Sequence, residues 1–138
     1  MAAPPSPPVP AHLAPDLVEV WESYVAMFGS MPPLPAAKFN ASGKINADFL
    51  RSVEDLRARA FYNTPLGMKT SQLVLFAMLL IQGNGAASHH AHAARLAGAS
   101  WEELHAVVEL ATAVGALAPS NNGGNILNAL MQQEPKDG

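Results

Sequence analysis

The chain has 138 residues, of which 49% are apolar and 14% charged, and its formal net charge is −3. This length and apolar content fit one domain with a single packed core. The few basic residues are scattered, which argues against a nucleic-acid partner. No apolar run reaches the roughly 18–20 residues that a membrane span needs, and the start does not resemble a signal peptide, so we expect no membrane partner and a cytoplasmic location. Cysteine is absent, which excludes disulfides, thiolate nucleophiles and thiolate metal ligands.

The first 43 residues combine one helical pattern with two proline-rich segments. Residues 1–15 are rich in proline and small side chains, which predicts a flexible arm. From Asp16 to Phe28 apolar residues recur at helical spacing, so we predict a helix there. Residues 29–43 contain three further prolines and are expected to cross the surface as an irregular segment.

A second helix is predicted from about Asn46 to Phe61. The sequence then forces a turn at Asn63–Gly67, where proline and glycine follow asparagine and threonine. Because apolar residues recur every three or four positions, one stripe of this helix is expected to face the core and the arginines to face solvent. The expected inner residues are Phe49, Val53, Leu56 and Ala60.

The third predicted helix starts at a Thr70 cap, runs to Ile81 and is apolar around its whole circumference. Such a helix must be covered on more than one side. A chain of this length supplies that cover with difficulty, so we expect a homo-oligomer. Residues 83–85, with two glycines, break the pattern, and an alanine-rich helix is predicted over 87–97.

Ser100 and Glu103 have the spacing of a capping box, in which each side chain pairs with a backbone N–H of the other residue. This box predicts a helix that runs through Val114 and ends before Gly115. A last helix is predicted from near Ser120 to just before position 134.

No strand pattern competes with the helices anywhere along the chain. The sequence therefore predicts an all-α fold of about six helices in a single domain over residues 16–133. Residues 134–138 are expected to form a short tail.

Three histidines, His89, His90 and His92, stand at the start of the alanine-rich helix. On a helix His89 and His92 share a face, whereas His90 points about 100° away from His89. Histidine moves protons near neutral pH, and helix N-terminal amides favour an anion, so an acid/base pocket is plausible here. The alternative is that two of them are surface or interface residues. His105, near an apolar stripe, is expected to be a core or interface histidine.

A divalent metal is the main rival, because His89 and His92 could supply two imidazoles and another element a carboxylate. No HExxH-type motif accompanies them. We therefore predict no metal and no cofactor.

Several short segments of the second half form a recognisable series. They are the run Met68–Leu73, the apolar helix after it, His90 eight residues before Gly98, the phrase Ala97–Leu104, and Asn122 after Ala118-Pro119-Ser120. Together, over about residues 64–131, they resemble the carboxymuconolactone decarboxylase and alkylhydroperoxidase-D family. The resemblance implies an all-helical bundle that assembles as a trimer or hexamer, with the site near subunit boundaries.

The family has two branches, which use the scaffold differently. Peroxidase members carry a CxxC pair ahead of a histidine; aligning that histidine with His90 places the two cysteines at Gly83 and Ala86, so thiol peroxidase chemistry is excluded. The decarboxylase branch keeps the histidine and needs no cysteine. This chain departs from that branch at Ala86, where an acidic residue is common, and at Ser71 or Gln72, where a basic residue is usual.

The resemblance and the histidines together predict a cofactor-free lyase that acts on a small carboxylated lactone or related carbonyl compound. Loss of carbon dioxide needs a donor at the developing oxyanion, a proton for carbon and an anchor for the carboxylate. We assign the proton transfer to His90, assisted by His92 or His89. A hydratase or isomerase on a similar substrate, or a non-catalytic oligomeric binding protein, remain the alternatives.

Four other residues are candidates for substrate binding. Asn84 or Asn122 would serve as a polar anchor, and Arg95, one turn beyond the histidines, would neutralise a carboxylate. The alternative for Arg95 is a solvated helix face. Tyr62, with the proline-rich segment, is expected to line or cover a neighbour's site.

Overall fold

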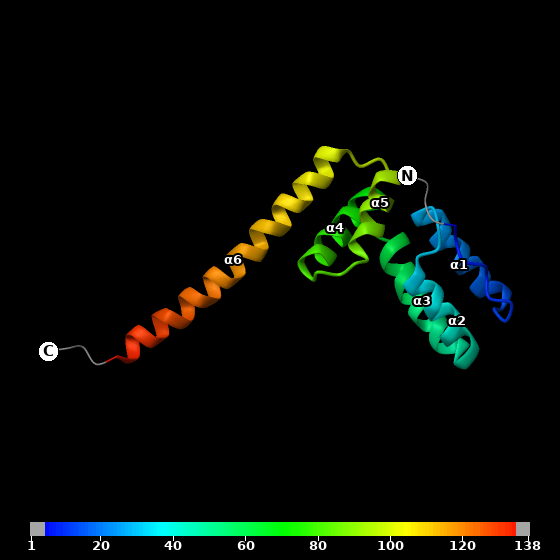
Figure 1. Ribbon diagram of the computed structural model, residues 1–138, viewed down its shortest axis with the longest axis horizontal. Coiled ribbons are helices and arrows are strands. Elements are labelled where there is room, and N and C mark those ends of the chain that lie inside the picture. The colour runs from blue at the N-terminus through cyan, green and yellow to red at the C-terminus, as the bar shows by residue number, and fades with distance from the viewer. Residues whose placement is uncertain (1–4, 135–138) are drawn as a thin grey trace.

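The computed structural model describes residues 5–134, and this part of the chain contains six helices and no strand. The all-α prediction is therefore confirmed. Figure 1 shows α1, α2 and α3 gathered at one end, α4 and α5 beside them, and α6 extending away as a long rod. The helices are α1 (Pro15–Phe28), α2 (Pro33–Ile45), α3 (Ala47–Tyr62), α4 (Gly67–Ile81), α5 (Ala87–Leu96) and α6 (Trp101–Gln133).

The helices bury two apolar clusters, which meet at α5. The first joins α1, α2 and α3, and in it the rings of Trp21 and Phe39 meet edge to face with centroids 5.6 Å apart. The second joins α4, α5 and the first turns of α6 around Phe76 and Leu104. Ala93 on α5 belongs to the first cluster, so α5 connects the two halves.

Residues 5–14, the described part of the predicted arm, form no helix and lie against the helical body. The Leu13 side chain is buried in the first cluster. The backbone N–H of Met31 donates to Ser6 Oγ over 2.8 Å, which ties this segment to the start of α2. The remainder of the predicted arm, residues 1–4, and of the predicted tail, residues 135–138, lie outside the described residues.

The prediction of an irregular segment over residues 29–43 is wrong, because α2 occupies most of it. Pro33 and Pro35 fall in the first turn of α2, where backbone N–H groups have no partner within the helix in any case. Pro32 holds the extended conformation of the residue before the helix. Phe39 then fixes the helix to the core, since its side chain is fully buried.

Helix α3 has the predicted bounds to within a residue, but the prediction of its buried face is wrong. Phe49 and Leu56 are 58% and 70% exposed, whereas Leu50 and Glu54 are buried. The helix is thus turned by about one residue from the apolar stripe. The buried face carries the ion cluster around Glu54 described below, in which the buried carboxylate is paired with two cations.

Helix α5 agrees closely with its predicted position, and α4 ends at Ile81 as predicted. The predicted Thr70 cap is wrong: α4 begins at Gly67, three residues earlier, without a side-chain cap, so Thr70 lies within its first turn. The capping box of Ser100 and Glu103 is confirmed in both directions. Among the described residues no single helix is long and apolar enough to cross a membrane; α3 and α4 approach that only as a pair bent by 113°.

The prediction of two helices separated near Gly115 is wrong, because α6 is continuous for 33 residues with Pro119 inside it. Proline removes one hydrogen bond to the carbonyl four residues earlier, which here belongs to Gly115, and a long helix can absorb one such loss. Helix propensity opposes this arrangement, because Pro119 and the glycines at 115, 123 and 124 together disfavour the helix by about 6 kcal/mol relative to alanine.

Candidate active site

A pocket of about 330 Å³ opens between α1, the start of α2, the second half of α3 and the turn that leads into α5. Aromatic rings and prolines form most of its wall, and one arginine, one asparagine and two histidines supply the polar groups. This mixture is typical of a small-molecule site. The lining residues are Tyr24, Phe28, Pro32, Pro33, Leu34, Pro35, Arg57, Phe61, Asn84, Gly85, Ala86, His89 and His90.

The turn between α4 and α5 places the histidines at the pocket. Gly83 adopts φ +63°, a left-handed conformation that suits glycine and ends α4. The Oδ1 atom of Asn84 accepts the Ala86 N–H at 2.9 Å, which fixes the chain just before α5 begins. His89 and His90 therefore fall in the first turn of α5, next to the pocket.

His90 is the most enclosed polar group of the pocket, with 8% of its surface exposed. Its Nδ1 atom lies 2.7 Å from Oε1 of the fully buried Gln72. Since an amide oxygen can only accept, Nδ1 carries the proton and Nε2 keeps a free lone pair. The rings of Phe28 and Phe61 meet the imidazole edge to face, at centroid distances of 5.3 and 5.8 Å.

The Nε2 atom of His90 is accessible. It has no hydrogen-bond partner in the described part of the chain, yet no buried side-chain nitrogen or oxygen there lacks a partner. Burial lowers the pKa of His90 to about 4, helped by the nearby charges of His89 and Arg57. At neutral pH His90 is therefore an uncharged base with its lone pair reachable from the pocket.

The low pKa of His90 makes stability depend on pH. Unfolded, this histidine takes up a proton below about pH 6.5, whereas in the fold it stays neutral down to about pH 4. The free energy of unfolding should thus fall on acidification from pH 6.5 to 4, by an amount on the order of 2 kcal/mol.

This pH effect can be measured by urea unfolding at pH 4.5 and 7.5. His90→Asn should narrow the difference between the two pH values, while His105→Asn, at a side chain that is 71% exposed, should leave it as in the wild type. An unchanged difference in His90→Asn would show that His90 is not the responsible group.

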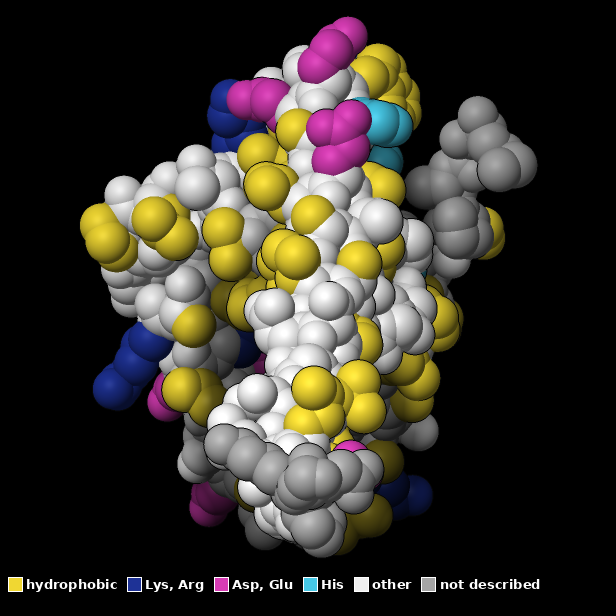
Figure 2. Space-filling model, turned by 90° about the vertical axis from the view of Figure 1, so that its left-hand side faces the viewer, with side chains coloured by type: hydrophobic (Ala, Val, Ile, Leu, Met, Phe, Trp, Pro, Cys, Tyr) yellow, Lys and Arg dark blue, Asp and Glu magenta, His cyan; other side chains and the backbone are white. Residues whose placement is uncertain are grey.

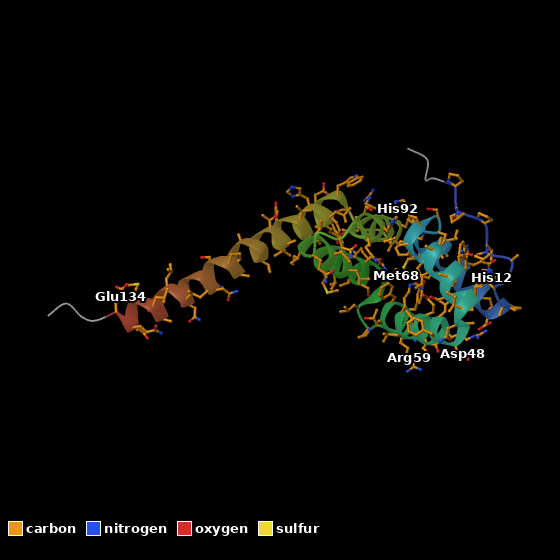
Figure 3. All side chains as sticks on the ribbon, turned by 60° about the horizontal axis from the view of Figure 1, so that its bottom comes forward. His12, Asp48, Arg59, Met68, His92 and Glu134 are labelled. Atoms are coloured by element: carbon orange, nitrogen blue, oxygen red, sulfur yellow. The ribbon has the colours of Figure 1, made fainter. Side chains whose placement is uncertain are left out.

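Of the three predicted histidines, the structure brings only His89 and His90 to the pocket. The His89 ring lies 6.1 Å from that of Phe28. His92 is exposed on α5 and lies near Gly29, outside the pocket walls (Figure 3). The pocket lies over the first turn of α5, between the faces that carry His89 and His90. These two neighbours therefore both reach it, whereas His92, three residues after His89, does not.

The predicted binding residues are scattered, and only Asn84 lines the pocket. Arg95 donates to the Ala99 carbonyl and lies over the Trp101 ring at 4.5 Å. Tyr62 borders a separate groove of about 290 Å³ between α1, α3, the start of α4 and α5. Asn122 is exposed on the outer part of α6, which carries no residue of the pocket.

Arg57 is the cation that the structure places in the pocket, and the sequence analysis had put it on the solvent side. Its side chain is only 10% exposed. The guanidinium carbon lies 3.5 Å from the centre of the Tyr24 ring and 5.3 Å from that of Phe61. The sequence did carry a signal for this placement. Glu54 and Arg57 are charged residues three apart, and they lie on the same helix face as the apolar Leu50 and Phe61.

Glu54 anchors this part of the pocket from behind. Its side chain is 2% exposed and accepts hydrogen bonds from the Tyr24 hydroxyl, at 3.1 and 3.0 Å, and from Lys38. Arg57 Nη1 lies 3.7 Å from the second carboxylate oxygen. Two cations thus share one carboxylate, which leaves a net positive charge beside the pocket, and burial raises the pKa of Tyr24 so that its hydroxyl stays protonated.

Within residues 5–134 no three side chains of the metal-binding types come together, so His89 and His92 gain no third ligand. The chemistry available to the pocket is that of a neutral imidazole, a guanidinium and an amide, surrounded by aromatic rings.

The chain is similar to a known protein family. The model of the carboxymuconolactone decarboxylase family matches residues 47–128, from the start of α3 well into α6. No curated protein and no solved structure matches the chain significantly. The matched segment spans more than half of the 138 residues and includes Glu54, Arg57, Gln72 and both pocket histidines. The chain therefore belongs to the carboxymuconolactone decarboxylase family.

Proposed function

We propose that this protein is a cofactor-free lyase that removes carbon dioxide from a small carboxylated lactone or a related carbonyl compound. The observation that carries the proposal is the neutral His90, held by Gln72 with Nε2 open to a pocket that also contains a guanidinium. Family membership supports the same class of reaction.

In such a decarboxylation the bond from the ring carbon to the carboxylate breaks, and its electron pair moves into the conjugated carbonyl. A proton delivered to carbon then completes the product. Negative charge that develops beside His90 raises the pKa of the imidazole, so Nε2 can take a proton from solvent and pass it to carbon. His89 and the Asn84 amide line the same pocket and are the candidates to assist.

Arg57 takes the role of substrate anchor that the sequence analysis gave to Arg95. The net positive charge of the Lys38, Glu54 and Arg57 cluster favours an anion, and a guanidinium pairs with a carboxylate through two parallel hydrogen bonds. The rings of Phe28 and Phe61 offer apolar walls to the rest of a small ring compound.

One alternative has a specific observation in its favour. A histidine that is neutral at pH 7 is already a base, which suits removal of a proton next to a carbonyl, as in an isomerase or hydratase. The two reactions differ in whether carbon is lost.

The test is an assay of the purified protein with unsaturated γ-lactones that carry a carboxylate, recorded for carbon dioxide release and for the ultraviolet change of the conjugated system. The methyl ester of each lactone is the matched control, because it keeps the ring and removes the charge. Carbon dioxide release from the acid alone supports the proposal. A spectral change without carbon dioxide points to the isomerase, and binding without conversion of any acid would refute the enzyme.

A further inference from the structure

The second half of α6 leads away from the other helices: up to Gly115 the helix still borders the end of α4, at Leu80 and Ile81, and beyond it the rod continues outward alone. Leu104 and Val107, in its first turns, are the last buried residues of the helix. Every residue from Val108 to Gln133 is at least partly exposed. At 1.5 Å per residue this exposed part extends about 39 Å, and Figure 1 shows it leading away from the other helices. We call residues 108–133 the arm.

The arm is apolar where a solvated helix would be charged. Figure 2 shows hydrophobic side chains spread along the rod that faces the viewer. Glu109 is the one charged residue in the arm. The large apolar side chains form two groups that are more than half exposed, and Val108, at 40%, precedes them. The groups are Leu110, Val114 and Leu117, then Ile126, Leu127, Leu130 and Met131.

The arm cannot be a stable helix in water on its own. It contains Pro119, three glycines and four asparagines, all poor helix formers. Helices of this length depend on tertiary packing even when their propensity is good. Something outside this copy of the chain must therefore cover the arm.

We propose that a second copy of this chain covers it, and that the arm packs into the groove between α3 and α4 of that copy. The groove has a volume of about 200 Å³ and carries no charged side chain. Leu66, Val74 and Met78 on its rim are 54%, 42% and 48% exposed. The arm and the groove both lack charge apart from Glu109, so neither repels the other. Figure 1 shows α6 leading away from α3, which forms one wall of the groove, so the arm does not fill the groove of its own copy.

The area available is enough for a stable contact. If each exposed large side chain of the arm loses on the order of 50–100 Å² of apolar surface, eight of them bury about 400–800 Å² per chain. Stable interfaces bury about 800 Å² per partner, and the rim of the groove supplies the remainder. Each residue turns a helix by 100°, so the two apolar groups point in directions about 140° apart around the arm. An arm with two such faces needs cover on both, and one flat surface would cover only one of them.

The first experiment measures mass and helix content together, by light scattering and far-ultraviolet circular dichroism. The wild type should have a mass of at least twice the 14.5 kDa of the chain. Leu127→Asp with Leu130→Asp should return the protein to monomers and remove the helical signal of about 20 residues. The matched control, Asn125→Asp with Gln132→Asp, adds the same charge on the opposite face and should keep the mass of the wild type. Tryptophan fluorescence, to which the buried Trp21 contributes, reports that the remaining fold is intact.

The second experiment identifies the occupant of the groove. Because the chain has no cysteine, single labels can be placed at Leu130→Cys on the arm and at Met78→Cys on the groove. Mixing donor-labelled arm protein with acceptor-labelled groove protein should give energy transfer between copies. A monomeric wild type with a full helical signal, a dimer without this transfer, or monomers that gain helix only on lipid vesicles would each overturn the proposal.

Discussion

Replacing His90 by asparagine should lower turnover of a carboxylated substrate by about 10²–10⁴-fold, the range that a positioned general acid or base contributes. Asparagine keeps a group that can hydrogen-bond to Gln72 but has no lone-pair nitrogen to carry a proton. Substrate binding should change little, because Arg57 remains to hold the carboxylate. Rate and KM measured on the decarboxylation assay give the two effects separately.

His105→Asn is the matched control for the His90 change, since it alters a histidine on α6 that is 71% exposed and outside the pocket. It should keep the rate of the wild type. A His90→Asn enzyme with full turnover would remove His90 from the mechanism. A large loss of turnover in His105→Asn would show that the assay reports folding and not chemistry.

Removing the carboxylate of Glu54 should destabilise the fold by about 3–5 kcal/mol, the usual cost of breaking a buried ion pair on one side. In Glu54→Ala the ammonium of Lys38 and the guanidinium of Arg57 would face each other without a counter-charge, and the Tyr24 hydroxyl would lose its acceptor. Urea unfolding followed by tryptophan fluorescence measures the change in the free energy of unfolding.

The neighbouring Asp55 offers the control for Glu54, because it is a carboxylate on the same helix that is exposed to solvent. Asp55→Ala should alter the free energy of unfolding by less than about 0.5 kcal/mol. Glu54→Gln, which keeps the shape and the acceptor oxygen, should fall between the two. Equal stability of Glu54→Ala and Asp55→Ala would contradict the buried cluster.

Local patterns predicted most of the helices. The bounds of α1, α3 and α5 follow from apolar spacing and from turn residues, and the Ser100 box fixes the start of α6. The predictions for α2 and α6 failed because both treated proline as a helix breaker. The prolines of α2 fall in its first turn, which tolerates them, and the long helix α6 continues through Pro119.

The site was only partly predictable, since it depends on contacts between distant segments. His89, His90 and Asn84 stand together in the sequence and could be found there. Glu54 on α3 bonds to Tyr24, 30 residues earlier, and pairs with Arg57 beside the pocket. The spacing of Leu50, Glu54, Arg57 and Phe61 marks this face of α3, but the contact with Tyr24 that buries it in place of the apolar stripe is visible only in the fold.

The hydrogen-bond partner of His90 could likewise not be predicted from the sequence. Gln72 lies 18 residues before it on another helix, so the hydrogen bond that selects the tautomer becomes visible only in the fold. The sequence could name the base but not the residue that holds it.

The most direct test of this account is the protonation state of His90, read by nitrogen-15 NMR of the histidine rings across pH 4–8. We expect a neutral ring with the proton on Nδ1 at pH 7, which becomes charged only as the pH approaches about 4. A ring that is already charged at pH 7, or one that carries its single proton on Nε2, would contradict the proposed base and the reaction built on it.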